Sequence, residues 1–355
     1  MRSLFILKCL KSKITWLYIL SGGFVLSTAL LGLFISSVQV PIPTILHIIS
    51  DNAFGFGWLE EIPKNEEMII WNIRLPRVLL GFCVGASLSL AGAAFQGLLR
   101  NPLADPYTIG VSSGASLGAV FVIFFQFSII GLGSFTLPVV AIISGFITLF
   151  LVFGLVKLSS RNLAIETIIL AGIIVSAFIG AIVSLIISLS DRDSMTQIIY
   201  WLYGSVGMRN WTHVTLIIPF MALGTFILFA NHRELNALAL GEEAADHIGV
   251  DVRKRKIFIL IGASLLTGAA VAVSGSIGFV GLVIPHLIRL ITGPNHRHVL
   301  PLSMFVGGAF LILADLVCRT IIAPKEMPIG VITALIGAPV FALLLIRERI
   351  GRRRS

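Results

Sequence analysis

The sequence predicts an all-α membrane protein with about ten transmembrane helices, in a single domain that covers residues 1–355. Three observations predict it. Apolar residues make up 57% of the chain and charged residues only 12%, whereas a soluble domain carries about 25% charged residues. The apolar residues form long unbroken blocks, unlike the short alternating segments of a membrane barrel. Lysine and arginine residues are shared unequally between successive loops.

Each apolar block is long enough, or nearly so, to cross a bilayer. A helix needs about 20 apolar residues to span the hydrocarbon core, at 1.5 Å rise per residue. The ten candidate spans lie near residues 16–38, 70–99, 108–127, 136–157, 163–190, 213–230, 256–274, 277–291, 299–318 and 328–346. The first block exceeds the apolar region of a signal peptide, which is about 7–15 residues long. We therefore expect it to remain as a span.

The net charge of +9 invites comparison with nucleic-acid-binding proteins. The distribution of the charges favours another explanation. If the N-terminus is cytoplasmic and the chain crosses ten times, 19 lysine and arginine residues face the cytoplasm and seven face outside. Cytoplasmic loops of membrane proteins carry this excess. We expect a multi-pass protein of the cytoplasmic membrane with both termini in the cytoplasm and no nucleic-acid partner.

Two predicted spans carry small residues at every fourth position. The fourfold spacing places each set on one helix face, where a neighbouring backbone can approach closely. The sets are Gly81, Gly85, Ser89, Ala93 and Gly97 in one span, and Gly110, Gly114 and Gly118 in the next. Helix packing and the lining of a transport pathway both explain the stripes, and the two roles are compatible.

The segment 277–291 differs from the other spans. About 15 residues give roughly 22 Å of helix, which is short of a 30 Å hydrocarbon core. Gly275, Gly278, Gly281 and Pro285 also interrupt it. Broken helices at membrane depth occur where they are buried in protein or line a cavity. We therefore predict a half-helix.

A short sequence echo links two of the spans. The sequence Gly85-Ala-Ser-Leu88 recurs as Gly262-Ala-Ser-Leu265. The two spans would run in opposite directions, as in transporters built from inverted repeats. The echo therefore suggests such a repeat.

Motifs for catalysis and metal binding are missing from the sequence. There is no His-Glu-x-x-His zinc motif and no Gly-x-x-x-x-Gly-Lys-Ser/Thr phosphate loop. We expect neither enzyme activity nor a bound metal or cofactor, so any ATP is used by a partner chain. His286, His296 and His298 are expected in a solvated loop. Proton and cation carriers bury ionisable residues in mid-membrane. None lies at the centre of a span, so an ion-coupled secondary carrier is a remote alternative.

Three arginines lie on the outer side, although lysine and arginine are usually enriched in cytoplasmic loops. Arg74 and Arg77 flank a Leu-Pro pair where a span begins, and Arg319 ends another. Asp315 precedes Arg319 by four residues, a spacing that allows an ion pair on a helix. The arginines either anchor the spans at the lipid surface or receive carboxylates of an external acidic partner, which arginine binds in bidentate fashion.

The cytoplasmic loop 231–255 contains a short helix signal. Gly241 opens it, Glu242 and Glu243 suit a helix N-terminus, and Gly249 closes it. A docking element for a soluble partner is one interpretation and a solvated connector is the other. The residues assigned to docking are Leu240, Gly241, Glu242, Glu243, Ala244, Ala245 and Gly249.

At these residues the chain resembles the permease family of ABC importers for iron-siderophores, haem and cobalamin, the type II importers. The resemblance covers residues 70–346, and more loosely the first span. The motifs that carry it are Arg74-Leu-Pro-Arg77, Gly97-Leu-Leu-Arg-Asn101-Pro102-Leu103-Ala104-Asp105-Pro106, Gly110-Val-Ser-Ser-Gly114-Ala-Ser-Leu-Gly118, Leu240-Gly-Glu-Glu-Ala-Ala245, Gly275-Ser-Ile-Gly-Phe-Val-Gly-Leu-Val-Ile-Pro285-His286 and Ile329-Gly-Val-Ile-Thr-Ala-Leu-Ile-Gly-Ala-Pro339.

The resemblance implies the type II permease fold and a set of partners. Two permease subunits, either identical or close paralogues, would enclose a pathway above two ATP-binding subunits. A substrate-binding protein would dock outside on Arg74, Arg77 and Arg319. The segment Leu240–Gly249 would be the coupling helix seated on the ATPase. An iron-siderophore is the expected cargo, with cobalamin and haem as alternatives, and the resemblance names no residue that contacts it.

Overall fold

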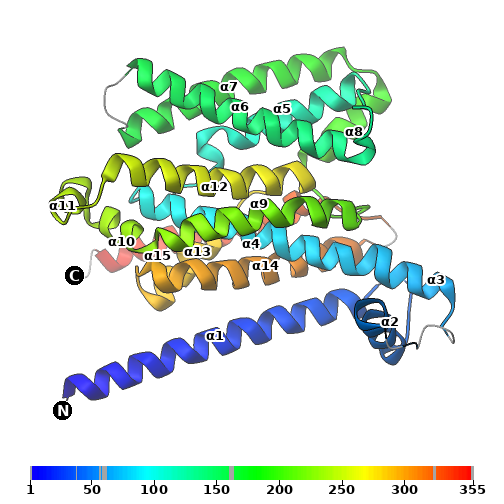
Figure 1. The fold of residues 1–355 in the computed structure, drawn as a ribbon, viewed down its shortest axis with the longest axis horizontal. Coiled ribbons are helices and arrows are strands. Elements are labelled where there is room, and N and C mark those ends of the chain that lie inside the picture. Colours follow the sequence, from blue (N-terminus) through cyan, green and yellow to red (C-terminus); the bar gives the residue numbers. More distant parts are fainter. Residues whose placement is uncertain are drawn as a thin grey trace.

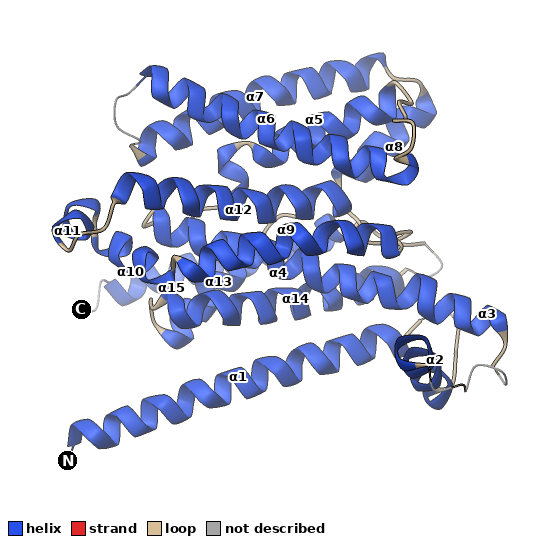
Figure 2. Ribbon diagram, viewed as in Figure 1, coloured by secondary structure: helices blue, strands red, loops and turns tan. Residues whose placement is uncertain are grey.

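The computed structural model describes residues 2–36, 38–55, 57, 62–159, 164–322 and 325–352. Figure 2 shows helices joined by loops, and no strand occurs among these residues. The α-helices are α1 (Arg2–Phe34), α2 (Ile42–Phe54), α3 (Lys64–Glu67), α4 (Leu75–Leu98), α5 (Val111–Phe124), α6 (Thr136–Ser159), α7 (Ile165–Leu189), α8 (Arg192–Leu202), α9 (Trp211–Ala230), α10 (His232–Leu240), α11 (Glu242–His247), α12 (Val252–Ser274), α13 (Val280–Thr292), α14 (His296–Thr320) and α15 (Ile329–Arg352). A π-helix, η2 (Met68–Arg74), leads directly into α4, and the 3-10 helices η3 (Pro106–Ile109) and η4 (Gly133–Phe135) precede α5 and α6.

The fold confirms the predicted all-α membrane class. In the described residues, seven helices are long and apolar enough to cross a bilayer. Three shorter apolar helices, Val111–Phe124, Val280–Thr292 and Ile329–Leu344, coincide with the three remaining predicted spans. The long helices run roughly parallel to one another (Figure 1).

Burial separates central helices from peripheral ones. In the most apolar window of α4, 89% of the residues are buried, and the value for α12 is 83%. The corresponding values for α1 and α9 are 22% and 28%. Large apolar side chains such as Phe150, Phe178 and Phe226 are exposed on the peripheral helices, as expected for a surface that faces lipid. The helices α4 and α12 form the centre of the subunit and pack against each other.

The small residues of α4 lie against α14. A methyl group added at Gly85 would come within 2.2 Å of the carbonyl oxygen of Gly307, and one at Gly97 within 2.2 Å of Nε2 of His296. Ala93 is fully buried. A larger side chain at Gly85 would therefore separate the two backbones.

The small residues of α5 lie against α6 in the same way. A methyl group at Gly114 would reach 2.1 Å from the Thr148 hydroxyl oxygen, and one at Gly118 would reach 2.5 Å from the Ser144 hydroxyl. Gly110 precedes the helix with a φ of +89°. Both stripes are thus occupied by contacts within the chain, which supports the packing alternative. A role in lining a pathway stays a prediction.

The predicted half-helix is α13. Its 13 residues give about 20 Å of helix, and the preceding Phe279 has a φ of +68°. In the irregular backbone before it, Ile277 is fully buried, and the Tyr107 hydroxyl donates to the Ile277 carbonyl at 2.9 Å and accepts from the Ile277 N–H at 3.1 Å. Non-helical backbone at membrane depth requires such partners, because lipid supplies none.

The two chain ends lie at the same end of the bundle. In Figure 1 the marked N- and C-terminal ends are on the side of α10 and α11, whereas α2, α3 and α8 lie at the opposite end. We call these the loop end and the far end. An even number of crossings requires this arrangement. Figure 1 also shows α4 and α12 running in opposite directions, as the sequence echo between them suggested.

Candidate functional site

The loop end carries two short helices between α9 and α12. Gly241, with a φ of +127°, separates α10 from α11, and Gly249, with a φ of +84°, follows α11. Both glycines occupy the predicted positions, because an L side chain is strained at such angles. One assignment changes. Leu240 is the last residue of α10 and not part of the short helix.

The helix α11 has one face against its own chain and one face free of it. Ala245 is fully buried in the apolar core that includes Leu235 and Leu238 of α10. Ala244 is exposed, and Ile248 is 68% exposed. Ala245 therefore cannot be a contact for a partner in this conformation, whereas Ala244 can.

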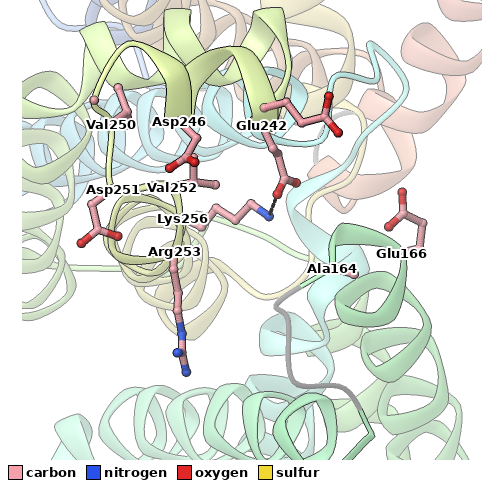
Figure 3. A pocket seen from close by; sticks show the side chains of 11 residues that line it. Ala164, Glu166, Glu242, Asp246, Val250, Asp251, Val252, Arg253 and Lys256 are labelled. Atoms are coloured by element: carbon pink, nitrogen blue, oxygen red, sulfur yellow. Dashed lines mark ion pairs between the residues drawn. The ribbon is translucent and has the colours of Figure 1, made fainter.

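An open cavity of about 950 Å³ separates α11 from the start of α7. Its lining residues are Ala164, Glu166, Glu242, Glu243, Asp246, Gly249, Val250, Asp251, Val252, Arg253 and Lys256. Five of these side chains are acidic and two are basic, so the cavity carries net negative charge within a chain of net charge +9. In Figure 3, Arg253 points away from Glu242 and Asp246, whereas Lys256 extends toward Glu242.

The first turns of α12 hold both short helices. Lys256 Nζ lies 2.6 Å from Glu242 Oε2 of α11. Arg255 lies 3.4 Å from Glu234 of α10 and donates to the Asn231 side-chain oxygen at 2.9 Å. Ionic contacts thus connect the loop end to a central helix. From the sequence, Arg255 and Lys256 counted only among the 19 basic residues expected on the cytoplasmic side, and both contacts were missed.

The predicted docking arginines lie at the far end. Arg77 Nε donates to both carboxylate oxygens of Asp315, at 3.1 and 2.9 Å. Its terminal nitrogens donate to Glu326 at 2.8 and 3.0 Å. The hydrogen bond from Arg77 keeps the pKa of Glu326 below its usual value. One guanidinium thereby joins α4, α14 and the loop before α15.

The other two arginines bind the end of α1. Arg74 donates to the carbonyl oxygens of Leu33 and Val38, and Arg319 donates to that of Gly32. Arg319 also lies 3.9 Å from Asp315, the four-residue pair that the spacing predicted.

These contacts bury arginines that the sequence predicted at the lipid surface or exposed to an external partner. Arg74 is 2% exposed and Arg77 is 9% exposed. Their partners lie 36 to 249 residues away in the chain, so no local sequence pattern indicates them. Docking of an external carboxylate on these arginines stays a prediction, and in this conformation it competes with contacts inside the chain.

The expectation of a solvated histidine loop is wrong for two of the three histidines. His286 is 7% exposed and His296 is 1% exposed. The Nδ1 atom of His296 lies 2.9 Å from the side-chain oxygen of Asn236 in α10. Across the described residues, no group of three or more His, Cys, Asp or Glu side chains is arranged to hold a metal ion.

Curated ABC transporter permeases match most of this chain. A Bacillus subtilis protein named as the uncharacterized ABC transporter permease YvrB is 51% identical over 95% of both chains. The cobalamin import permease BtuC of Halobacterium salinarum is 42% identical, over 81% of this chain and 76% of its own. The hemin transport permease HmuU of Yersinia pestis is 43% identical, over 84% of this chain and 90% of its own.

A solved structure and a family model indicate the same kind of protein as these relatives. A metal-chelate type ABC transporter solved in an inward-facing conformation superposes with a TM-score of 0.79 at 36% identity, covering 94% of this chain and 98% of its own. The family model for the FecCD transport family matches residues 24–347. The chain therefore belongs to the FecCD transport family, and it is a permease subunit of an ABC importer.

Proposed function

We propose that this permease subunit carries a metal chelate of the iron-siderophore type across the cytoplasmic membrane, with cobalamin or haem as the alternative cargo. The observation that carries the proposal is membership of the FecCD family over residues 24–347. Whereas a relative that is 38% identical is named for molybdate, relatives named for cobalamin and hemin support a metal bound in a large organic ligand. The solved metal-chelate transporter supports the same class of cargo.

The energy source for transport determines which partner subunits this permease would need. The described spans show no chain of buried carboxylates across mid-membrane, of the kind that proton-coupled carriers use; the Arg77–Asp315 pair lies at the far end. Energy would come from ATP hydrolysed on a separate subunit, and this chain would be neither an enzyme nor a cofactor protein. We propose a pair of permease subunits, two ATP-binding subunits and an external substrate-binding protein.

The loop end would face the cytoplasm and the ATPase. The exposed edge of α11 and the acidic cavity beside it are the surface that supports this placement. An ATP-driven movement of the ATPase would displace α11, and the central helices would then open the pathway at the opposite face. The chelate would pass through chemically unchanged.

Uptake measurements test the cargo. Cells that lack this gene are supplied with a radiolabelled ferric siderophore, cobalamin or haem, and accumulation is compared with that in cells carrying the gene on a plasmid. We expect ATP-dependent accumulation of one chelate to fall to background in the deletion and to recover with the plasmid. Unchanged uptake of all three classes would overturn the metal-chelate proposal.

A further inference from the structure

The helix α11 has few attachments to the rest of the chain. Glycines with positive φ border it on both sides, at positions 241 and 249. Ala245 is its one buried residue. The helix has only six residues, so its own backbone hydrogen bonds hold it weakly. Its position therefore depends on the contacts that Ala245 and Glu242 make.

The Glu242 contact differs from an ordinary surface ion pair. Lys256 is 3% exposed and its ammonium group lies 2.6 Å from the Glu242 carboxylate. Exposed pairs contribute little because water and salt screen them. Because Lys256 is buried, water and salt screen this pair less than a pair on the surface, so separating the two charges is more costly.

The other partner of the pair is anchored firmly. Lys256 belongs to α12, where 83% of the residues in the most apolar window are buried. Ile259 and Leu260, on the next turn of the same helix, are fully buried. A displacement of Glu242 would therefore pull on a helix at the centre of the subunit, and not on a peripheral one.

We propose that the Glu242–Lys256 ion pair is the positioning link that transmits movement of α11 to α12. This inference rests on the proposed function, because it takes α11 as the surface that the ATPase moves. Arg255 and Glu234 join α10 to α12 in a similar way, but Arg255 is half-buried and its pair is longer. The apolar contact of Ala245 alone is the competing route.

The first experiment separates coupling from assembly. Tagged permease is purified in nanodiscs with the ATPase subunit that accompanies it, and ATP hydrolysis is measured with and without the external binding protein loaded with chelate. Lys256→Met removes the ion pair without changing the docking residues of α11, so it should retain the ATPase subunit and basal hydrolysis, whereas stimulation should fall at least about fivefold. The exchange Glu242→Lys with Lys256→Glu should restore it.

A matched control uses the same chemical change nearby. Lys254 lies two residues before Lys256 and its side chain is exposed, so Lys254→Met should be stimulated like the wild type. Stimulation of Lys256→Met at the wild-type level would overturn the link and leave Ala245 as the route. A wild-type permease that recruits no ATPase at all would instead count against the proposed function.

A second experiment tests the link without any partner. Backbone amide exchange of α11 is measured by mass spectrometry on the isolated full-length permease in detergent. Loss of the pair should accelerate exchange in the peptide 241–250 by about fivefold or more, and the charge exchange should reverse the effect. Exchange at the wild-type rate in Lys256→Met would refute the link whatever the cargo is.

Discussion

At the scale of single residues, the buried charges of Arg77 and Asp315 are paired within the chain. Arg77 binds Asp315 in bidentate fashion, with both side chains at most 10% exposed. Such a pair adds little net stability when intact, because burial of both charges is costly. Loss of one member, however, leaves the other charged and buried. Arg77 is thus better understood as a clamp between helices than as an exposed docking group.

The clamp predicts a large stability loss for Arg77→Met. Asp315 would keep only its longer contact with Arg319, at 3.9 Å, so loss of the buried Arg77 partner should cost up to about 3–5 kcal/mol, which we expect as a clear fall in the thermal unfolding midpoint in detergent. Arg192→Met, a change to an exposed arginine, is the control and should unfold like the wild type. An unfolding midpoint for Arg77→Met equal to that of Arg192→Met would contradict the clamp.

The Glu326 carboxylate should make the stability of the fold depend on pH. The hydrogen bond from Arg77 lowers the pKa of Glu326 in the folded chain, so the carboxylate stabilises the fold above its unfolded pKa of about 4.3. This contribution is lost as the pH falls through the lower folded pKa. Unfolding midpoints of wild type and Glu326→Gln should differ near neutral pH and converge only below about pH 4. Convergence already near pH 6 would show that another group is responsible.

At the scale of helices, backbone contact determines which positions tolerate substitution. Gly85 of α4 and Gly307 of α14 are in such contact, whereas Gly180 of α7 has no atom within 4 Å of an added methyl group. The same substitution therefore has opposite consequences at the two positions. Packed backbone cannot shift as a flexible side chain can.

Gly85→Ala and Gly180→Ala form a matched pair. The added methyl group at Gly85 would lie 2.2 Å from a carbonyl oxygen, so we expect a cost at or above the roughly 1–3 kcal/mol of overpacked cores. The measurement is the monodisperse yield and thermal midpoint of fluorescent fusions after size-exclusion chromatography. Equal behaviour of the two variants would show that α4 and α14 are not packed as described.

The helix α11 predicts different outcomes for two adjacent alanines. Ala244 is exposed and Ala245 is fully buried. Ala244→Arg should leave the permease folded in the membrane but abolish uptake, because the side chain would occupy the proposed contact with the ATPase. Ala245→Arg should lower the amount of folded permease instead. Wild-type uptake by Ala244→Arg at matched permease content would refute the coupling role of the exposed face.

The sequence predicted the long elements well and the local contacts poorly. Ten apolar blocks identified the spans, because lipid imposes a single composition on every helix that faces it. The amphipathic helix α10 was missed, although Leu235 and Leu238 show the three-residue spacing of a buried face. The inward position of Lys256 was also readable, since it lies one turn before Leu260 on the same helix face. The partners of Arg77 are 238 and 249 residues away and could not be read from one sequence.

At the scale of the whole molecule, charge and topology agree. Both marked chain ends and the helices α10 and α11 lie at one end of the bundle (Figure 1). That end holds the loops to which the sequence assigns 19 of the 26 lysine and arginine residues. Because membrane proteins retain such loops in the cytoplasm, the loop end should be cytoplasmic.

Reporter fusions test this orientation. An enzyme that is active only in the cytoplasm is fused after Ser355, and in a second chimera it is inserted at Ile130, which is fully exposed in the loop between α5 and α6. In Figure 1 that loop lies at the far end. We expect activity from the first chimera and none from the second, at equal expression. The reverse pattern would invert the topology, and with it the assignment of α11 to the ATPase and of the arginine end to the external binding protein.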